Sequence, residues 1–171
     1  MQTDTIPDGM EPRFVESVDL GEVYFSRFRP GEDLFERTTA VCKENGIERA
    51  VILSGVGSLC DVGFRNLRSG IHLPVDKTKT NLMEEYGPFE LLTLEGTIVP
   101  LVGTFGDLKE GDPVLHAHAT LGQAYGSLIG GHLVKAKVYT TVEILIAKIR
   151  NSTVRKKQSP VTGLTEMRTD V

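Results

Sequence analysis

Three of the four histidines of this chain lie within one short stretch, HAHATLGQAYGSLIGGH, which runs from residue 116 to residue 132. They are His116, His118 and His132. A neutral imidazole is the commonest side-chain ligand of metals in proteins. Three nitrogen ligands with one open position suit a borderline cation, for which Zn²⁺ is the first choice. The stretch therefore predicts a metal site with Zn²⁺ as its cofactor, provided that the backbone brings the three rings together; other divalent metals are not excluded.

Strand geometry can bring them together. Side chains alternate along a strand, so His116 and His118 point to one face, about 6.5–7 Å apart at their bases. A hairpin turn centred on Tyr125 sets His132 opposite His118, and opposite side chains have Cβ atoms about 4.5–5.5 Å apart. A bulge at Gly130-Gly131 would instead turn His132 to the other face. In the unbulged register, His118 is adjacent to both other rings.

Such a site has more than one use. A metal-bound water with its pKa lowered to about 7 would make the site a hydrolytic centre. The metal could equally be structural. As a third alternative, the three histidines bind no metal and are hydrogen-bonded residues of the core or of an interface. Two acids, Glu90 and Glu143, interrupt apolar strands. Each is a candidate catalytic residue that orients an imidazole or receives a proton, and strand alternation explains both equally well.

The segments around the histidines predict an α+β fold, a largely antiparallel sheet with one main amphipathic helix. The helix lies within RPGEDLFERTTAVCKENG, with acids in its first turn and Gly46 as its cap. EVYFSRFR and IERAVILSGVGSL are strands, the second running into a glycine turn, and most of residues 61–149 is strand-like. LPVDKTKTNLMEEYGP is expected to be an exposed loop. Residues 1–19 are expected to be a flexible lead-in, residues 20–150 the domain and residues 151–171 a flexible tail.

Composition limits the function classes. The 171 residues carry a net charge of −4, so no global positive field attracts DNA, RNA or an anionic membrane. No signal peptide and no membrane-spanning segment is indicated. Cys42 and Cys60 suggest buried thiols in a reducing cytoplasm. The nucleotide, hydrolase-elbow and zinc-protease motifs are missing. One basic cluster, KIRNSTVRKK, offers a weak nucleic-acid contact, or is simply a solvated tail; its candidate residues are Arg150, Arg155, Lys156 and Lys157.

The segments GVGSL, GPFELLTLEGTIV, HAHATL and GSLIGGHLVKAKVYTTVEILI, in this order, resemble the plants-and-prokaryotes conserved (PPC) domain. The resemblance spans about Val23 to Ile149. It implies a compact α+β protomer, a homotrimer, a description as a DNA-binding-protein homologue, and a metal-binding histidine cluster at His116, His118 and His132. The Phe-Glu motif of the family maps onto Phe89 and Glu90.

Two departures from the plant members bear on function. Pro88 stands where the plant form has an arginine, so its partner role is not carried over, and the Arg-Gly-Arg-Pro core of an AT-hook is absent. Two hypotheses follow. The protein is a homotrimeric DNA-binding or regulatory protein with a three-histidine metal site, or it is a small zinc-dependent enzyme, of hydrolase type, on an unknown substrate.

Overall fold

The computed structural model describes residues 13–169, so most of the expected N-terminal lead-in lies outside the described residues. The described part forms a single α-helix, a short 3₁₀ helix and eight strands. In chain order these are β1 (Asp19–Phe28), α1 (Leu34–Glu44), β2 (Ala50–Leu67), η1 (Lys77–Lys79), β3 (Thr80–Glu85), β4 (Phe89–Val102), β5 (Pro113–Gly122), β6 (Leu128–Arg150), β7 (Arg155–Gln158) and β8 (Thr165–Arg168).

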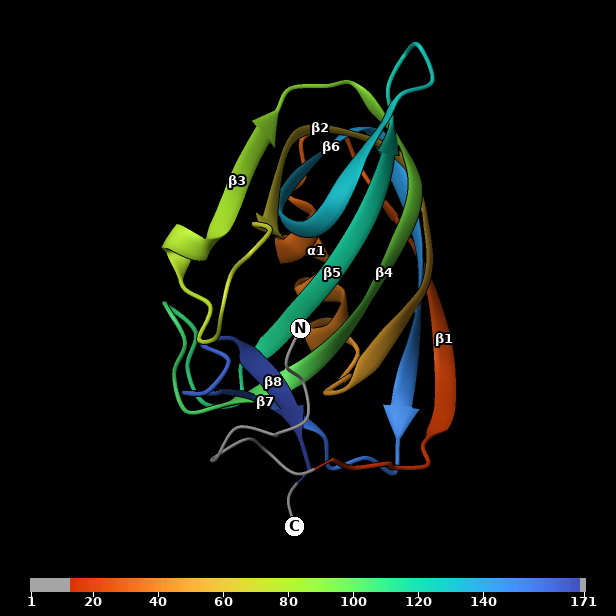
Figure 1. Ribbon diagram of the computed structural model, residues 1–171. Helices are drawn as coiled ribbons and strands as arrows, with labels where there is room; N and C mark the ends of the chain where they lie inside the picture. The colour runs from red at the N-terminus through yellow and green to blue at the C-terminus, as the bar shows by residue number, and fades with distance from the viewer. Residues whose placement is uncertain (1–12, 170–171) are drawn as a thin grey trace.

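The sheet curls until it closes on itself (Figure 1). β2 pairs with β6, β6 with β5, β5 with β4, and β4 pairs back with β2. β1 and β3 extend this circuit at β6 and β2. All these pairings are antiparallel, whereas β4 and β7 run parallel. The predicted class, a mostly antiparallel sheet with one helix, is therefore confirmed, with one parallel pairing that makes the sheet mixed.

Helix α1 forms where the sequence predicts it. Asp33 caps its first turn by accepting hydrogen bonds from the backbone N–H groups of Phe35 and Glu36. Its buried residues, Leu34, Thr38, Val41 and Cys42, follow helical spacing and pack into the core. Gly46, just beyond the helix, has φ of +62° and supplies the left-handed turn that ends it. Figure 1 shows α1 behind β5, and the helix packs against β6, β1 and β5.

Two expectations for the first half of the sheet are wrong. The glycine turn expected after Leu53 is absent, because β2 continues as one bent strand through Gly55 and Gly57. Its register shifts let β2 pair with β6 and β4 in turn. The segment expected to be an exposed loop contains η1 and β3, and β3 pairs with β2 from Val62 to Leu67. Long-range pairing thus orders residues whose local sequence is typical of a loop.

The expected flexible tail is also wrong for residues 151–169. β7 and β8 form a hairpin, and β7 adds to β4 through Leu101 and Lys156. Val154, Ser159 and Thr162 are buried in it. Strands of four residues turn only alternate side chains inward, so the segment lacks a long apolar pattern. The C-terminal hairpin therefore belongs to the folded body.

Within residues 13–169, no helix combines the length and the apolarity that crossing a membrane requires.

Candidate metal centre and its pocket

The hairpin of β5 and β6 positions the three histidines as predicted. Its turn closes with a hydrogen bond from the Gln123 N–H to the Ser127 carbonyl, 2.9 Å long, on either side of Tyr125. His118 pairs directly with His132, and the register continues unbroken through Gly130 and Gly131. No bulge turns His132 away, so its ring lies on the same face of the sheet as the other two.

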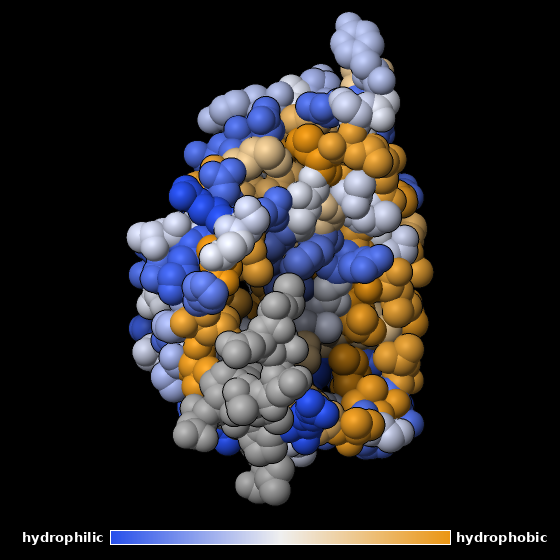
Figure 2. All heavy atoms as spheres, viewed as in Figure 1, coloured by the Kyte–Doolittle hydropathy of each residue, from blue (hydrophilic) through white to orange (hydrophobic). Residues whose placement is uncertain are grey.

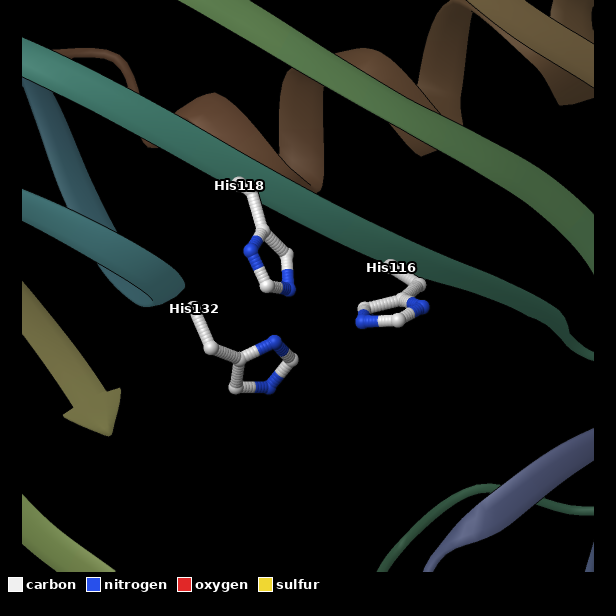
Figure 3. Close-up of side chains that lie close together, drawn as sticks. All are labelled: His116, His118 and His132. Atoms are coloured by element: carbon white, nitrogen blue, oxygen red, sulfur yellow. The ribbon is translucent and has the colours of Figure 1, made fainter. Parts of the chain in front are cut away.

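The three imidazoles form a nearly equilateral triangle (Figure 3). Ring centroids of His116, His118 and His132 are 5.0–5.3 Å apart, and one nitrogen of each ring lies within 4.8 Å of the others. Tetrahedral Zn²⁺, with bonds of about 2.1 Å, needs its nitrogens about 3.4 Å apart. Small side-chain rotations close this difference, so the three residues fit a metal ion. His118 is adjacent to both other rings, as predicted, but each of the other two is equally so, because the three sides are equal within 0.3 Å.

Asn66 holds the β6 side of the triangle. Its Oδ1 accepts a hydrogen bond from the His132 backbone N–H, 3.1 Å long, and its Nδ2 donates to the Gly130 carbonyl at 3.0 Å. Gly131 has φ of +135°, and a Cβ there would lie 2.0 Å from Asn66 Oδ1. A glycine is therefore required at position 131 for Asn66 to reach past it and fix His132.

The surroundings of His116 and His132 favour the neutral imidazole, the form that binds metal. Burial, followed by the charge of Lys156 and then by the other two imidazoles, lowers the pKa of His116 to about 4. Burial first, and then His118, also lowers the pKa of His132. Lys156 itself is 3% exposed, and its Nζ lies 3.0 Å from Nδ1 of His116. Because Lys156 engages Nδ1, Nε2 is the nitrogen that His116 has left for a metal.

The histidines form one wall of a hollow of about 400 Å³, within the range of small-molecule sites. His116 and His118 alternate on β5 with Ala117 and Ala119, which are buried in the core, so the imidazoles face away from that core. The C-terminal hairpin and β2 supply other walls. The hollow is lined by Arg65, Leu67, Thr80, Phe105, Val114, Leu115, His116, His118, His132, Val134, Lys156, Leu164 and Thr165.

Neither predicted acid joins this site. Glu90 is exposed and pairs with Gly122, four residues along β5 from His118, which is about 13 Å. Glu143 is exposed on the far part of β6, opposite Arg27 and Val56. The carboxylate that the sheet sets beside the histidines is Glu95, which pairs directly with His118.

The predicted nucleic-acid cluster is mostly occupied within the fold. Arg150 pairs with Glu22, and Arg155 lies 3.4 Å from Glu110. Lys156 is buried against His116, which corrects its assignment to a nucleic-acid contact. Lys157 is exposed. The four residues therefore do not form one free basic surface.

Sequence reasoning did not place four residues at this site: Arg65, Asn66, Glu95 and Lys156. It assigned Lys156 to a nucleic-acid contact instead. Glu95 follows from pairing β4 with β5 only once the register shift between Leu91 and Thr93 is known, because that shift sets Glu95, in place of Leu94, opposite His118. Arg65 and Lys156 come from strands far from the hairpin in sequence. Neither carries a local signal that predicts its place beside the histidines.

A family model of the Plants and Prokaryotes Conserved (PCC) domain, also abbreviated PPC, matches residues 15–150. The chain therefore belongs to this family. Its fold is similar to that of a crystallised PPC protein from Pyrococcus horikoshii, with 26% identity and a TM-score of 0.70 over 93% of this chain and 100% of that one.

Other relatives add context. A metal-containing protein from Archaeoglobus fulgidus has the same fold, with 24% identity and a TM-score of 0.74 over 91% of this chain and 99% of that one. Structures from Bacteroides thetaiotaomicron and Ralstonia eutropha, at 21% and 18% identity, are described as candidate DNA-binding proteins. A bifunctional protein GlmU from Synechococcus is 30% identical over 146 residues. These are 85% of this chain but 20% of that protein, so the chain spans about a fifth of the length of this curated relative.

Proposed function

We propose that this PCC-domain protein is a metal-dependent regulatory binding protein whose three histidines hold one divalent cation, Zn²⁺ in the first place. The observation that carries the proposal is the triangle of His116, His118 and His132, with ligand nitrogens within 4.8 Å of one another. Three neutral nitrogens suit zinc, and the hollow in front of them gives a ligand access to the open coordination position.

The metal proposal is tested by purifying the protein without a tag and measuring bound metal per chain. We expect about one zinc per chain, since three protein ligands bind one cation. In His118→Ala the zinc affinity should fall by more than about 100-fold, because the loss of an outer-shell partner alone costs about 10–100-fold. His72→Ala, at an exposed histidine outside the triangle, is the matched control. Equal zinc binding by wild type and His118→Ala would overturn the proposal.

A second candidate function is zinc-dependent hydrolysis. One observation favours it: Glu95 lies directly opposite His118, one of the three candidate ligands, in the β4–β5 register. A carboxylate there would receive a proton from a water whose pKa the cation lowers. If so, hydrolysis of 4-nitrophenyl acetate by the zinc-loaded protein should fall about 100-fold in Glu95→Gln while its zinc content is kept. An unchanged rate in Glu95→Gln would leave the binding function as the better account.

The apolar outer face of the sheet supports a homotrimer. Val23, Phe25, Leu53, Val56 and Leu92 are 47–66% exposed on β1, β2 and β4. Figure 2 shows apolar side chains gathered along the side of the molecule on which β1 lies. Exposed apolar surface of this extent marks protein interfaces. Two further copies of this chain are the proposed occupants, as the family resemblance implies.

The proposal that DNA is a partner is supported by the descriptions of two structural neighbours and by the resemblance to the PPC family. Arg150 and Arg155 are paired with acids and Lys156 is buried, so these residues offer little to a phosphate backbone. The net charge of −4 also opposes it. Cys42 and Cys60 are free thiols, which supports the cytoplasm as the compartment.

A further inference from the structure

Lys156 is a buried cation without a carboxylate partner. It is 3% exposed, and within residues 13–169 no carboxylate lies within ion-pair distance of its Nζ. In the described part of the chain, the one hydrogen-bond partner of its Nζ is Nδ1 of His116, at 3.0 Å. Burying an ammonium group is costly unless a charge or hydrogen-bond acceptor compensates it. The fold therefore holds Lys156 at the hollow at an energetic cost.

Metal binding would remove even that acceptor. An imidazole that binds a cation through Nε2 carries its proton on Nδ1. Nδ1 of His116 is then a donor, and an ammonium group can only donate. With the metal in place, Lys156 needs another acceptor, and the hollow that it lines is where an acceptor can enter.

A second cation faces the same hollow. Arg65 extends from β2 beside the histidines, half-buried, and takes part in none of the ion pairs found in the described part of the chain. A guanidinium group binds carboxylates through two parallel hydrogen bonds. Of the described residues that line the hollow, none is acidic. A protein with net charge −4 thus keeps one pocket whose fixed charges are all positive.

Apart from Thr80 and Thr165, the rest of the lining is apolar. Six side chains from five segments of the chain form it: Leu67, Phe105, Val114, Leu115, Val134 and Leu164. A small inorganic anion would leave these walls in contact with water, whereas a ligand with an apolar body buries them. The volume of about 400 Å³ fits a small organic molecule.

We propose that the hollow binds an organic carboxylate with an apolar body, whose anionic group is recognised by Lys156 and Arg65 beside the metal. The inference deepens the proposed function, because the metal and the carboxylate share one pocket. The ligand acts as the signal that the regulatory protein reads, and metal and anion strengthen the binding of each other.

The test uses the zinc-loaded 171-residue protein and calorimetric titration with hexanoate, with hexanamide and acetate as comparison probes. Hexanamide keeps the chain but lacks the charge, and acetate keeps the charge but lacks the chain. We expect hexanoate to bind about tenfold or more tightly than either, as one charge-assisted hydrogen bond is worth that much. Hexanamide binding as tightly as hexanoate would overturn the proposal.

Lys156→Met tests anion recognition at full zinc loading. It keeps the length of the side chain and removes the charge, and we expect hexanoate affinity to fall about tenfold when the variant and the wild type are both saturated with zinc. Lys157→Met changes the neighbouring exposed lysine and should leave hexanoate affinity unchanged. If Lys156→Met fails to fold by circular dichroism, Arg65→Met carries the same expectation. Hexanoate affinity unchanged in the folded variant contradicts the inference.

The two proposals fail separately. If the purified protein holds no zinc and takes up none, the metal proposal fails. If that metal-free protein still prefers hexanoate to hexanamide, and Lys156→Met abolishes the preference, the anion pocket stands without the metal. If zinc binds as expected but no probe distinguishes charge, the anion pocket fails and the metal site stands.

Discussion

At the scale of single residues, the site combines neutral metal ligands with buried or half-buried cations. His116 stays neutral because it is half-buried next to Lys156, which favours its uncharged form. The same lysine is buried where β7, which pairs with β4, holds it against His116 of β5. His116 therefore depends on its surroundings for the neutral form that its proposed role needs.

The two cysteines make a residue-scale prediction. Cys42 is fully buried in α1, and burial raises the pKa of its thiol from 9.0 to about 11. At pH 8 in the folded protein, iodoacetamide should therefore modify the partly exposed Cys60 and leave Cys42 unmodified. The thiol of Cys42 ionises at a lower pH in the unfolded chain than in the folded protein. Its contribution to the free energy of unfolding is therefore fully present below pH 9 and is lost as the pH rises from 9 towards 11.

Mass spectrometry of the alkylated protein checks this directly. In denaturant both cysteines should react, which serves as the control. Cys42 reacting as fast as Cys60 in the native state would show that α1 opens readily from the core.

At the scale of elements, the hairpin of β5 and β6 carries the ligands and β2 fixes their geometry. Asn66, on β2, is the link, because it bonds both the Gly130 carbonyl and the His132 N–H. The hairpin alone determines which residues face each other. The contact with β2 determines how closely His132 approaches the other two rings.

Asn66→Ala should therefore weaken zinc binding about 10–100-fold although it removes no ligand, as outer-shell losses do. Competition with a chromogenic zinc chelator measures the affinity. Asn81→Ala is the matched control, since Asn81 pairs with Asn66 in the β2–β3 ladder but is exposed. The role assigned to Asn66 is wrong if the two variants bind zinc equally well.

At the scale of the whole molecule, the exposed apolar face over β1, β2 and β4 predicts that three copies of the chain associate. Phe25 is 66% exposed within it. Light scattering should give a mass of about 56 kDa for the wild type, three times the 18.7 kDa of one chain. Phe25→Asp should lower the mass towards that of one chain, because a charge in an apolar interface is left unpaired.

The control for this experiment is Tyr125→Asp, since Tyr125 is fully exposed at the tip of the β5–β6 hairpin, outside that face. A wild-type mass near 18.7 kDa would remove the homotrimer. If the protein is a trimer and Phe25→Asp leaves its mass unchanged, the interface does not lie on the apolar face over β1, β2 and β4.

The sequence by itself determined the helix, the strands around it and the histidine triangle. These depend on short-range rules: helical spacing in α1, a period of two along β5, and a turn at Tyr125 that sets His118 opposite His132. The stretch from His116 to His132 is one hairpin, so local geometry is enough to place all three rings.

Only the tertiary structure decided what surrounds the triangle. Lys156 reaches His116 across forty residues because β7 pairs in parallel with β4, and no local pattern encodes that pairing. Glu95 faces His118 because a register shift in β4 sets it there in place of Leu94, whereas Glu90, on the same face, pairs four residues further along β5. Contacts between distant strands depend on the packing of the whole sheet, and for this reason the pocket and its charges appear only in the folded chain.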